Sequence, residues 1–123
     1  MSINWKPVLI AGFWAELLHL TLYLISKRYA GSAFQVLIYF DWFIPLLLGG
    51  LWIARKTGSR FLLHGVLVGI AANLIFVILH VPLWLYRLPS GQYWIKCGAS
   101  FIVKTLGSVA GAIVGGKRNI GAG

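Results

Sequence analysis

Five polar side chains interrupt otherwise apolar stretches of this chain and are the residues best suited to chemistry. They are Glu16, His19, Asp41, Asn73 and Lys104. Carboxylates and imidazoles within a membrane are common carriers of protons and common ligands of cations. The same groups can instead satisfy one another, with Lys104 paired to Glu16 or Asp41 and the other side chains supplying hydrogen bonds. The pattern therefore leaves two interpretations open, a proton- or cation-binding cluster and a structural lock on helix register.

The elements that must position these residues are long apolar runs. The chain has 123 residues, of which 59% are hydrophobic and 11% charged, with a mean hydropathy of +0.85; a soluble domain of this size could not bury so much apolar surface. Runs of about 20 residues, long enough to cross roughly 30 Å of hydrocarbon, cover residues 7–26, 34–54, 61–85 and 97–116. No alternating strand pattern occurs, so we expect an all-α fold. It would be a four-transmembrane-helix bundle with short loops, forming one integral membrane domain over residues 1–123.

The depth of each polar residue follows from the helical rise of 1.5 Å per residue in spans that alternate in direction. Glu16 and Asn73 fall near the bilayer centre. His19, Asp41 and Lys104 each fall about 4 to 5 Å from it, toward the non-cytoplasmic side. Because Asp41 and Lys104 share a depth, we expect them to approach within salt-bridge distance.

Small residues recur at helical spacing in the third and fourth runs. Gly65 and Gly69 are four residues apart, and Gly107, Gly111 and Gly115 form a GxxxGxxxG pattern. Small residues allow helices to approach closely in membranes. These glycines therefore predict helix-packing faces of the glycine-zipper kind.

Catalytic and metal-binding motifs are lacking. The lone Cys97 excludes an intramolecular disulfide and a CxxC site, and no Gly-rich phosphate loop, nucleophile elbow or HExxH occurs. We therefore expect a non-enzymatic protein without metal or cofactor. His80 and His19 leave open the alternative that a histidine ligates a haem or chlorophyll-type pigment, although neither has a partner histidine at a defined spacing. His64, at the start of its run, is expected to meet lipid headgroups.

The basic residues indicate how the chain is oriented. Six lie on the side of the termini (Lys6, Arg55, Lys56, Arg60, Lys117 and Arg118), against four on the other side (Lys27, Arg28, Arg87 and Lys96). Cations beside apolar runs anchor helix ends and attract anionic headgroups, so they do not indicate nucleic-acid binding. The positive-inside rule favours cytoplasmic termini.

Two stretches resemble known membrane proteins. The segments LGGLWIARK at 48–56, LHGVLVG at 63–69 and GAIVGGK at 111–117 resemble small uncharacterised four-helix proteins of the bacterial inner membrane. That resemblance implies a fold and a location, but no activity.

The segment LIAGFWAE at 9–16 is similar to the first helix of the small multidrug resistance transporters. In that family a membrane-embedded glutamate exchanges protons for cationic drugs, and the resemblance implies this role for Glu16 alone.

Two functions follow as expectations. The first is a small accessory or assembly subunit of a larger membrane complex, since no extramembrane domain and no catalytic constellation are present. The alternative is a dimeric proton-coupled transporter that uses Glu16 with His19 and Asp41. The partners expected are the lipid bilayer together with other membrane subunits or a second copy of the chain.

Overall fold

The computed structural model describes residue 3, residues 5–57 and residues 60–122, with 117–122 as backbone only. The predicted all-α fold is confirmed. Its elements are α1 (Trp5–Tyr29), the 3-10 helix η1 (Gly31–Ala33), α2 (Phe34–Thr57), α3 (Phe61–Tyr86) and α4 (Gly91–Ala122). Each of the four α-helices is long and apolar enough to cross a membrane. Residues 58–59 of the expected basic turn, and the side chains of Lys117 and Arg118, lie outside the described part.

Helix α4 begins earlier than the predicted span 97–116. Its first turn starts directly after Ser90, whose Oγ accepts a hydrogen bond from the backbone N–H of Tyr93 at 3.4 Å. The first residues of α4 include Trp94 and Lys96, which are typical of a membrane interface and lower the apolar signal although the backbone is helical. The other three helices contain their predicted spans and extend them only at the ends.

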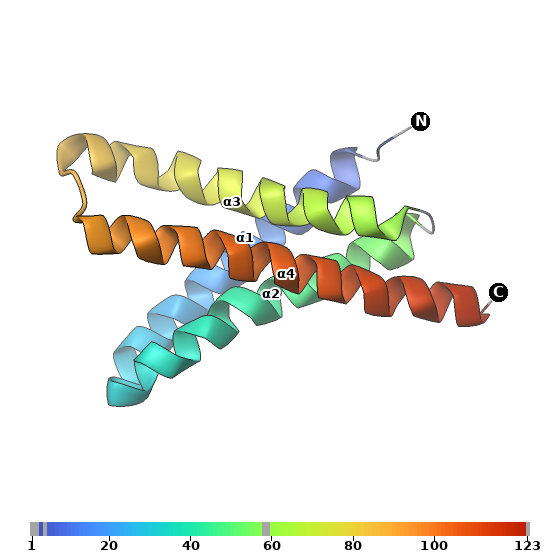
Figure 1. Cartoon of the computed structure of the whole chain (residues 1–123), viewed down its shortest axis with the longest axis horizontal. Coiled ribbons are helices and arrows are strands. Elements are labelled where there is room, and N and C mark those ends of the chain that lie inside the picture. Colours follow the sequence, from blue (N-terminus) through green and yellow to red (C-terminus); the bar gives the residue numbers. More distant parts are fainter. Residues whose placement is uncertain (1–2, 4, 58–59, 123) are drawn as a thin grey trace.

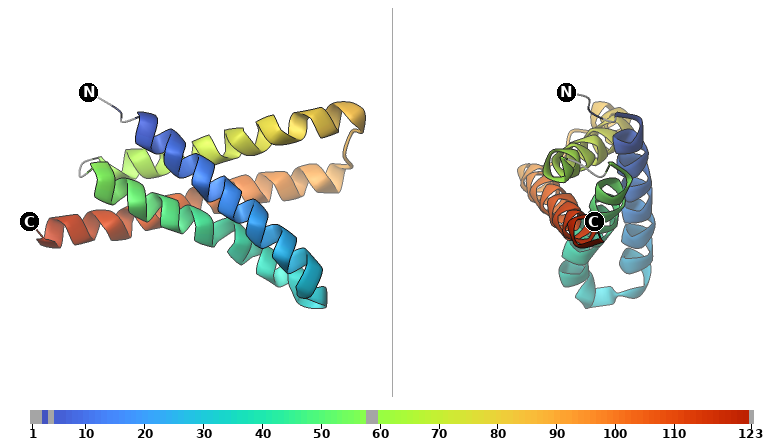
Figure 2. Two further views of the ribbon diagram at one scale, coloured as in Figure 1. Left: turned by 180° about the vertical axis from the view of Figure 1, so that it is seen from behind. Right: turned by 90° about the vertical axis from the view of Figure 1, so that its right-hand side faces the viewer.

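The four helices form two hairpins that cross. Helices α1 and α2 are joined through η1, and α3 and α4 through residues 87–90. The hairpins converge where the N-terminus, the end of α2, the start of α3 and the C-terminus lie together, and their turns diverge at the opposite end (Figure 1). The views from behind and from the side show the same divergence (Figure 2).

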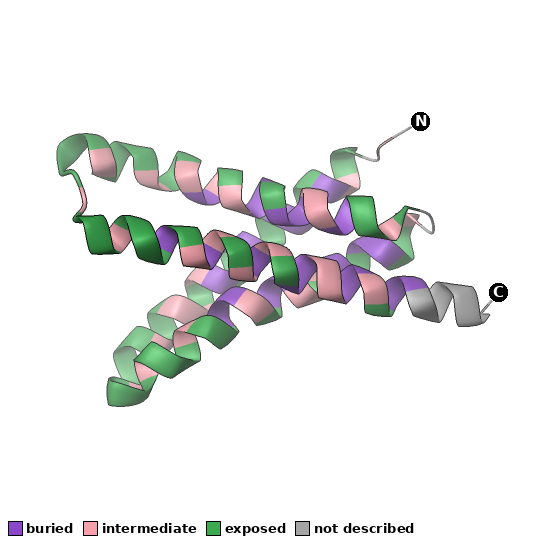
Figure 3. Ribbon diagram, viewed as in Figure 1, coloured by how far each residue is buried: buried purple, intermediate pink, exposed green. Residues whose placement is uncertain are grey.

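The packed core lies where the hairpins cross. Buried positions cluster there, whereas the helix ends beside the two hairpin turns are largely exposed (Figure 3). Apolar residues of the core include Val8, Leu46, Ile53, Val68 and Ala72. Many large apolar side chains of the four helices, such as Leu24, Ile78 and Leu85, are exposed, and lipid is the matching solvent for them.

Glycines of α4 lie directly against the backbone of α2. Gly107, Gly111 and Gly115 face the carbonyl oxygens of Phe43, Leu47 and Leu51, respectively. A Cβ atom on Gly107 would lie 2.7 Å from the facing oxygen, one on Gly115 would lie 2.8 Å from it, and one on Gly111 would overlap it. Any larger side chain at these positions would therefore push α2 and α4 apart.

Glycines of α3 provide the second contact of α4. A Cβ atom on Gly65 would lie 2.6 Å from Cβ of Ala112, and one on Gly69 would lie 2.8 Å from Cα of Thr105. Helix α4 is thus held closely between α2 and α3. This packing fixes the position from which Lys104 enters the core.

Candidate functional site

A buried ion pair between α1 and α4 is the most polar feature of the core. Lys104 Nζ lies 2.9 Å from Glu16 Oε2 and 3.3 Å from Oε1, so it donates to both carboxylate oxygens. The exposed fractions of the two side chains are 0% and 1%. Lys104 Nζ also lies 4.5 Å from the centre of the Phe76 ring on α3, where an aromatic face stabilises a cation. The two charges therefore neutralise each other inside the bundle.

The predicted salt bridge between Asp41 and Lys104 is wrong. Lys104 extends toward α1 and α3, where its partners are Glu16 and Phe76. The prediction compared depths in parallel helices, whereas the hairpins cross, so residues at one calculated depth need not meet (Figure 2). Asp41 is buried, and its Oδ2 has no hydrogen-bond partner among the described residues.

Asp41 contacts His19 through its backbone. Pro45, inside α2, has no N–H, so the carbonyl of Asp41 four residues earlier lacks its helical donor. His19 Nδ1 lies 3.0 Å from this carbonyl oxygen, and because a carbonyl only accepts, Nδ1 carries the hydrogen. The Asp41–Pro45 spacing is a sequence signal for this contact, which was not among the predictions.

Asn73 joins α3 to α4 independently of the ion pair. Its Nδ2 donates to the Phe101 carbonyl oxygen and to Thr105 Oγ1, each at 3.3 Å. Its Oδ1 is buried and has no partner among the described residues. The five polar residues are therefore distributed over three separate contacts: Glu16 with Lys104, His19 with Asp41, and Asn73 with α4.

His64 does not meet headgroups, contrary to expectation. It is 1% exposed, and its Nδ1 lies 2.9 Å from the carbonyl oxygen of Arg60. It precedes Gly65, whose close contact with α4 brings this turn of α3 into the core. Hydropathy alone places His64 at a helix start, but helix packing determines its burial.

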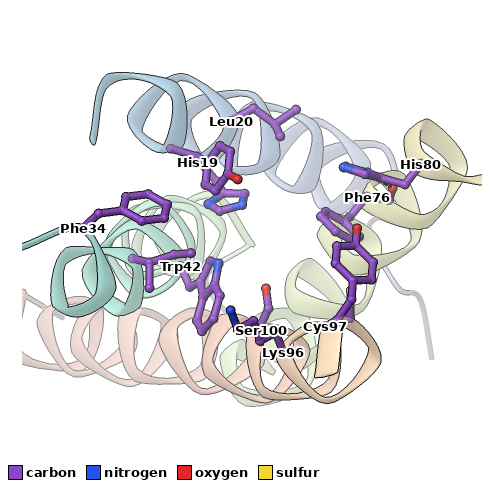
Figure 4. Close-up of a pocket in the computed structure, with 12 residues that line it drawn as sticks. His19, Leu20, Phe34, Trp42, Phe76, His80, Lys96, Cys97 and Ser100 are labelled. Atoms are coloured by element: carbon purple, nitrogen blue, oxygen red, sulfur yellow. Dashed lines mark hydrogen bonds between the residues drawn. The ribbon is translucent and has the colours of Figure 1, made fainter. Parts of the chain in front are cut away.

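A half-open cavity of about 270 Å³ lies between the two hairpins on the side where they diverge. His19 from α1 and His80 from α3 line it on opposite sides, and Ser100 reaches it from α4 (Figure 4). Cys97, also from α4, lines it as well. Trp42 and Phe76 contribute rings to its walls, and no local pattern in the sequence predicts that these distant residues meet.

Both histidines of the cavity have one ring nitrogen engaged. His80 Nδ1 lies 2.8 Å from the Phe76 carbonyl oxygen, and its ring stacks on that of Phe76 with centroids 4.0 Å apart. Like His19 Nδ1, it must carry the hydrogen of this bond. Among the described residues, none makes a hydrogen bond to Nε2 of either histidine. In the neutral rings both Nε2 atoms are therefore acceptors.

A second groove of about 380 Å³, lined by aliphatic and aromatic residues, lies between α1 and α2. Its lining includes the small residues Ala11 and Ala15 from α1 and Gly49 from α2. Trp14 and Trp52 also line it. Along α1 the lining runs from residue 10 to residue 18, which corresponds to about 12 Å or two helical turns.

Within the described residues, no group of three or more His, Cys, Asp or Glu side chains is arranged to hold a metal ion. Comparisons of the chain with protein-family models, with curated proteins and with solved structures find no match.

Proposed function

We propose that this chain is a non-enzymatic accessory or assembly subunit of a larger complex in the bacterial inner membrane, with both termini in the cytoplasm. The observation that carries the proposal is the closed Glu16–Lys104 pair. Both carboxylate oxygens of Glu16 accept from Lys104 at 2.9 and 3.3 Å. A carboxylate engaged in this way is not free to bind a cationic substrate, and the adjacent ammonium group would repel one.

The route to a partner is through helix faces. In the described chain only short connections join the four helices, so a partner must be contacted mainly within the bilayer. The groove between α1 and α2 is apolar, and small residues such as Ala15 and Gly49 line it. Small residues permit the close backbone approach that drives helix association in lipid. A transmembrane helix of a partner subunit is the occupant that we propose.

Purification in a mild detergent tests this proposal. We expect a heterologous membrane protein to co-purify in fixed stoichiometry and to be lost in the Gly49→Leu variant, which fills the groove. Val114→Leu, at an exposed position of α4, is the matched control and should retain the partner. Recovery of the chain without any partner, or a partner retained equally by both variants, would contradict the proposal.

The second candidate is a dimeric proton-coupled transporter. The half-open cavity favours it, because His19 lines that cavity and lies one helical turn from Glu16. A transporter predicts a homodimer with pH-dependent ligand binding and a proton-coupled flux in proteoliposomes that Glu16→Gln abolishes. The subunit proposal predicts that Glu16→Gln retains hydrogen bonding to Lys104 and leaves assembly intact. Flux that depends on Glu16 would decide for the transporter.

A further inference from the structure

The cavity between the hairpins contains a polar atom that the described residues leave unsatisfied. Ser100 is 4% exposed and lines the cavity, and its Oγ has no hydrogen-bond partner among the described residues. In Figure 4 this side chain points into the cavity. A buried hydroxyl without a partner is unfavourable. A molecule bound in the cavity would supply the missing hydrogen bond.

The histidines define which polar groups such a molecule must carry. His19 and His80 each donate from Nδ1 to a backbone carbonyl, which leaves lone pairs on Nε2 in the neutral rings. A molecule held between them must therefore donate hydrogen bonds. Toward Ser100 it can either donate or accept, since a hydroxyl does both. A ligand hydroxyl group meets both requirements, because it donates to an imidazole and accepts from a serine.

The walls of the cavity indicate the shape of the ligand. Aromatic rings line it at Tyr23, Phe34, Trp42, Phe76 and Tyr93, and aromatic rings stack favourably on flat ligands. Its volume of about 270 Å³ is just below the roughly 300–1,000 Å³ of pockets for drug-sized ligands. One substituted ring fits this space better than a four-ring pigment.

The charge of the lining residues and the route into the cavity restrict the class of ligand further. No carboxylate is among the described residues that line the cavity, and Lys96 is one of them, so an organic cation would be repelled. The cavity lies between membrane-spanning helices, and its lining residues belong to the helix halves beside the two hairpin turns. Because Tyr93 and Lys96 of the lining are residues typical of a membrane interface, a ligand that enters there comes from the interfacial layer of the bilayer, which suits a lipophilic ring that carries a hydroxyl group.

We infer that this cavity binds a lipophilic hydroquinone or phenol. One ring hydroxyl donates to Nε2 of His19 or His80 and accepts from Ser100, while the ring packs against the aromatic walls. The site belongs to the chain alone and requires no partner subunit. Its test is therefore separate from that of the proposed function.

The experiment is a calorimetric titration of the full chain in lipid nanodiscs with duroquinol under anaerobic conditions. Empty nanodiscs measure partitioning into lipid. The dimethyl ether of duroquinol is the matched control ligand, since it keeps the substituted ring but has no hydroxyl donor. We expect saturable binding of duroquinol above partitioning and at least about tenfold weaker binding of the ether, as loss of a hydrogen bond to a buried group predicts.

Variants test the residues that carry the inference. Ser100→Ala should weaken duroquinol binding roughly three- to tenfold. Ser108→Ala is the matched control on the same helix, because Ser108 Oγ already donates to the Thr105 carbonyl at 2.9 Å and does not line the cavity. His80→Phe keeps a ring against Phe76 and removes the acceptor, and it provides the test if Ser100→Ala fails to fold.

Three results would overturn the inference. The first is equal binding of duroquinol and its ether. The second is unchanged affinity in both cavity variants, Ser100→Ala and His80→Phe. The third is duroquinol uptake no greater than in empty nanodiscs, together with saturable binding of oleate. If that oleate binding is lost in Lys96→Gln, the cavity is a site for an anionic lipid.

Discussion

Replacing Lys104 by methionine should destabilise the bundle strongly. The substitution keeps much of the side-chain volume but removes both hydrogen bonds to Glu16, at 2.9 and 3.3 Å. Hydrogen bonds to charged groups contribute roughly 1.5–3 kcal/mol each, which gives about 3–6 kcal/mol for two. Breaking a buried ion pair by removing one partner costs about 3–5 kcal/mol, so both arguments lead to the same range. A loss of about 3 kcal/mol corresponds to a change of roughly 150-fold in the folding equilibrium.

A double-mutant cycle separates the pair from other effects of the substitution. Glu16→Gln combined with Lys104→Met removes both charges, so the double variant should recover part of the stability lost in Lys104→Met. We expect a coupling free energy above about 1.7 kcal/mol, the upper end for neutral hydrogen bonds between membrane helices. The parallel cycle with Asp41→Asn should be additive within about 0.5 kcal/mol, because Asp41 forms no ion pair with Lys104.

The assay is unfolding by sodium dodecyl sulfate in mixed micelles, followed by far-ultraviolet circular dichroism for all variants under one set of conditions. A coupling near zero for Glu16 with Lys104, or a larger coupling for Asp41 than for Glu16, would refute the assignment of the pair.

Two further predictions concern the helix contacts. Gly111→Leu should destabilise the bundle by at least about 1–3 kcal/mol, as overpacking does, because a side chain there meets the α2 backbone. Val114→Leu, at an exposed position, should be tolerated in the same unfolding assay. Equal tolerance of both substitutions would show that the α2–α4 contact is not close. His19→Phe should cost about 1–3 kcal/mol by leaving the Asp41 carbonyl without a donor, and should cost less in a Pro45→Ala background, where the alanine N–H can bond to that carbonyl. Identical costs of His19→Phe in both backgrounds would refute the role of Pro45.

The helices were predictable because each apolar run is long enough to require a span. The start of α4 could not be predicted in this way. Tyr93, Trp94 and Lys96 are typical interfacial residues, so hydropathy excludes them from the apolar run, although they belong to the same continuous helix. Glycines at four-residue spacing indicated that α3 and α4 have packing faces. Which helix each face meets depends on the crossing of the hairpins, which local sequence does not encode.

The choice of ion-pair partner shows the same limit. Burial of Glu16, Asp41 and Lys104 was inferred from their positions in apolar runs, but a calculation of depth along parallel axes selected the wrong carboxylate. The long lysine side chain reaches α1, and α2 is not its partner. By contrast, the contact of His19 with the Asp41 carbonyl could in principle have been predicted from the sequence, since Pro45 removes the helical donor of that carbonyl. The cavity could not have been predicted, because its rings and polar groups come from all four helices.

Photocrosslinking in native membranes tests the central claim, that a partner helix occupies the groove between α1 and α2, most directly. A photoreactive residue is placed at Leu48 in the groove, with Ile102, an exposed residue of α4, as the control position. The subunit proposal predicts one discrete adduct with a heterologous membrane protein from Leu48 and none from Ile102. Adducts with lipid alone at both positions, or an adduct between two copies of this chain, would contradict it.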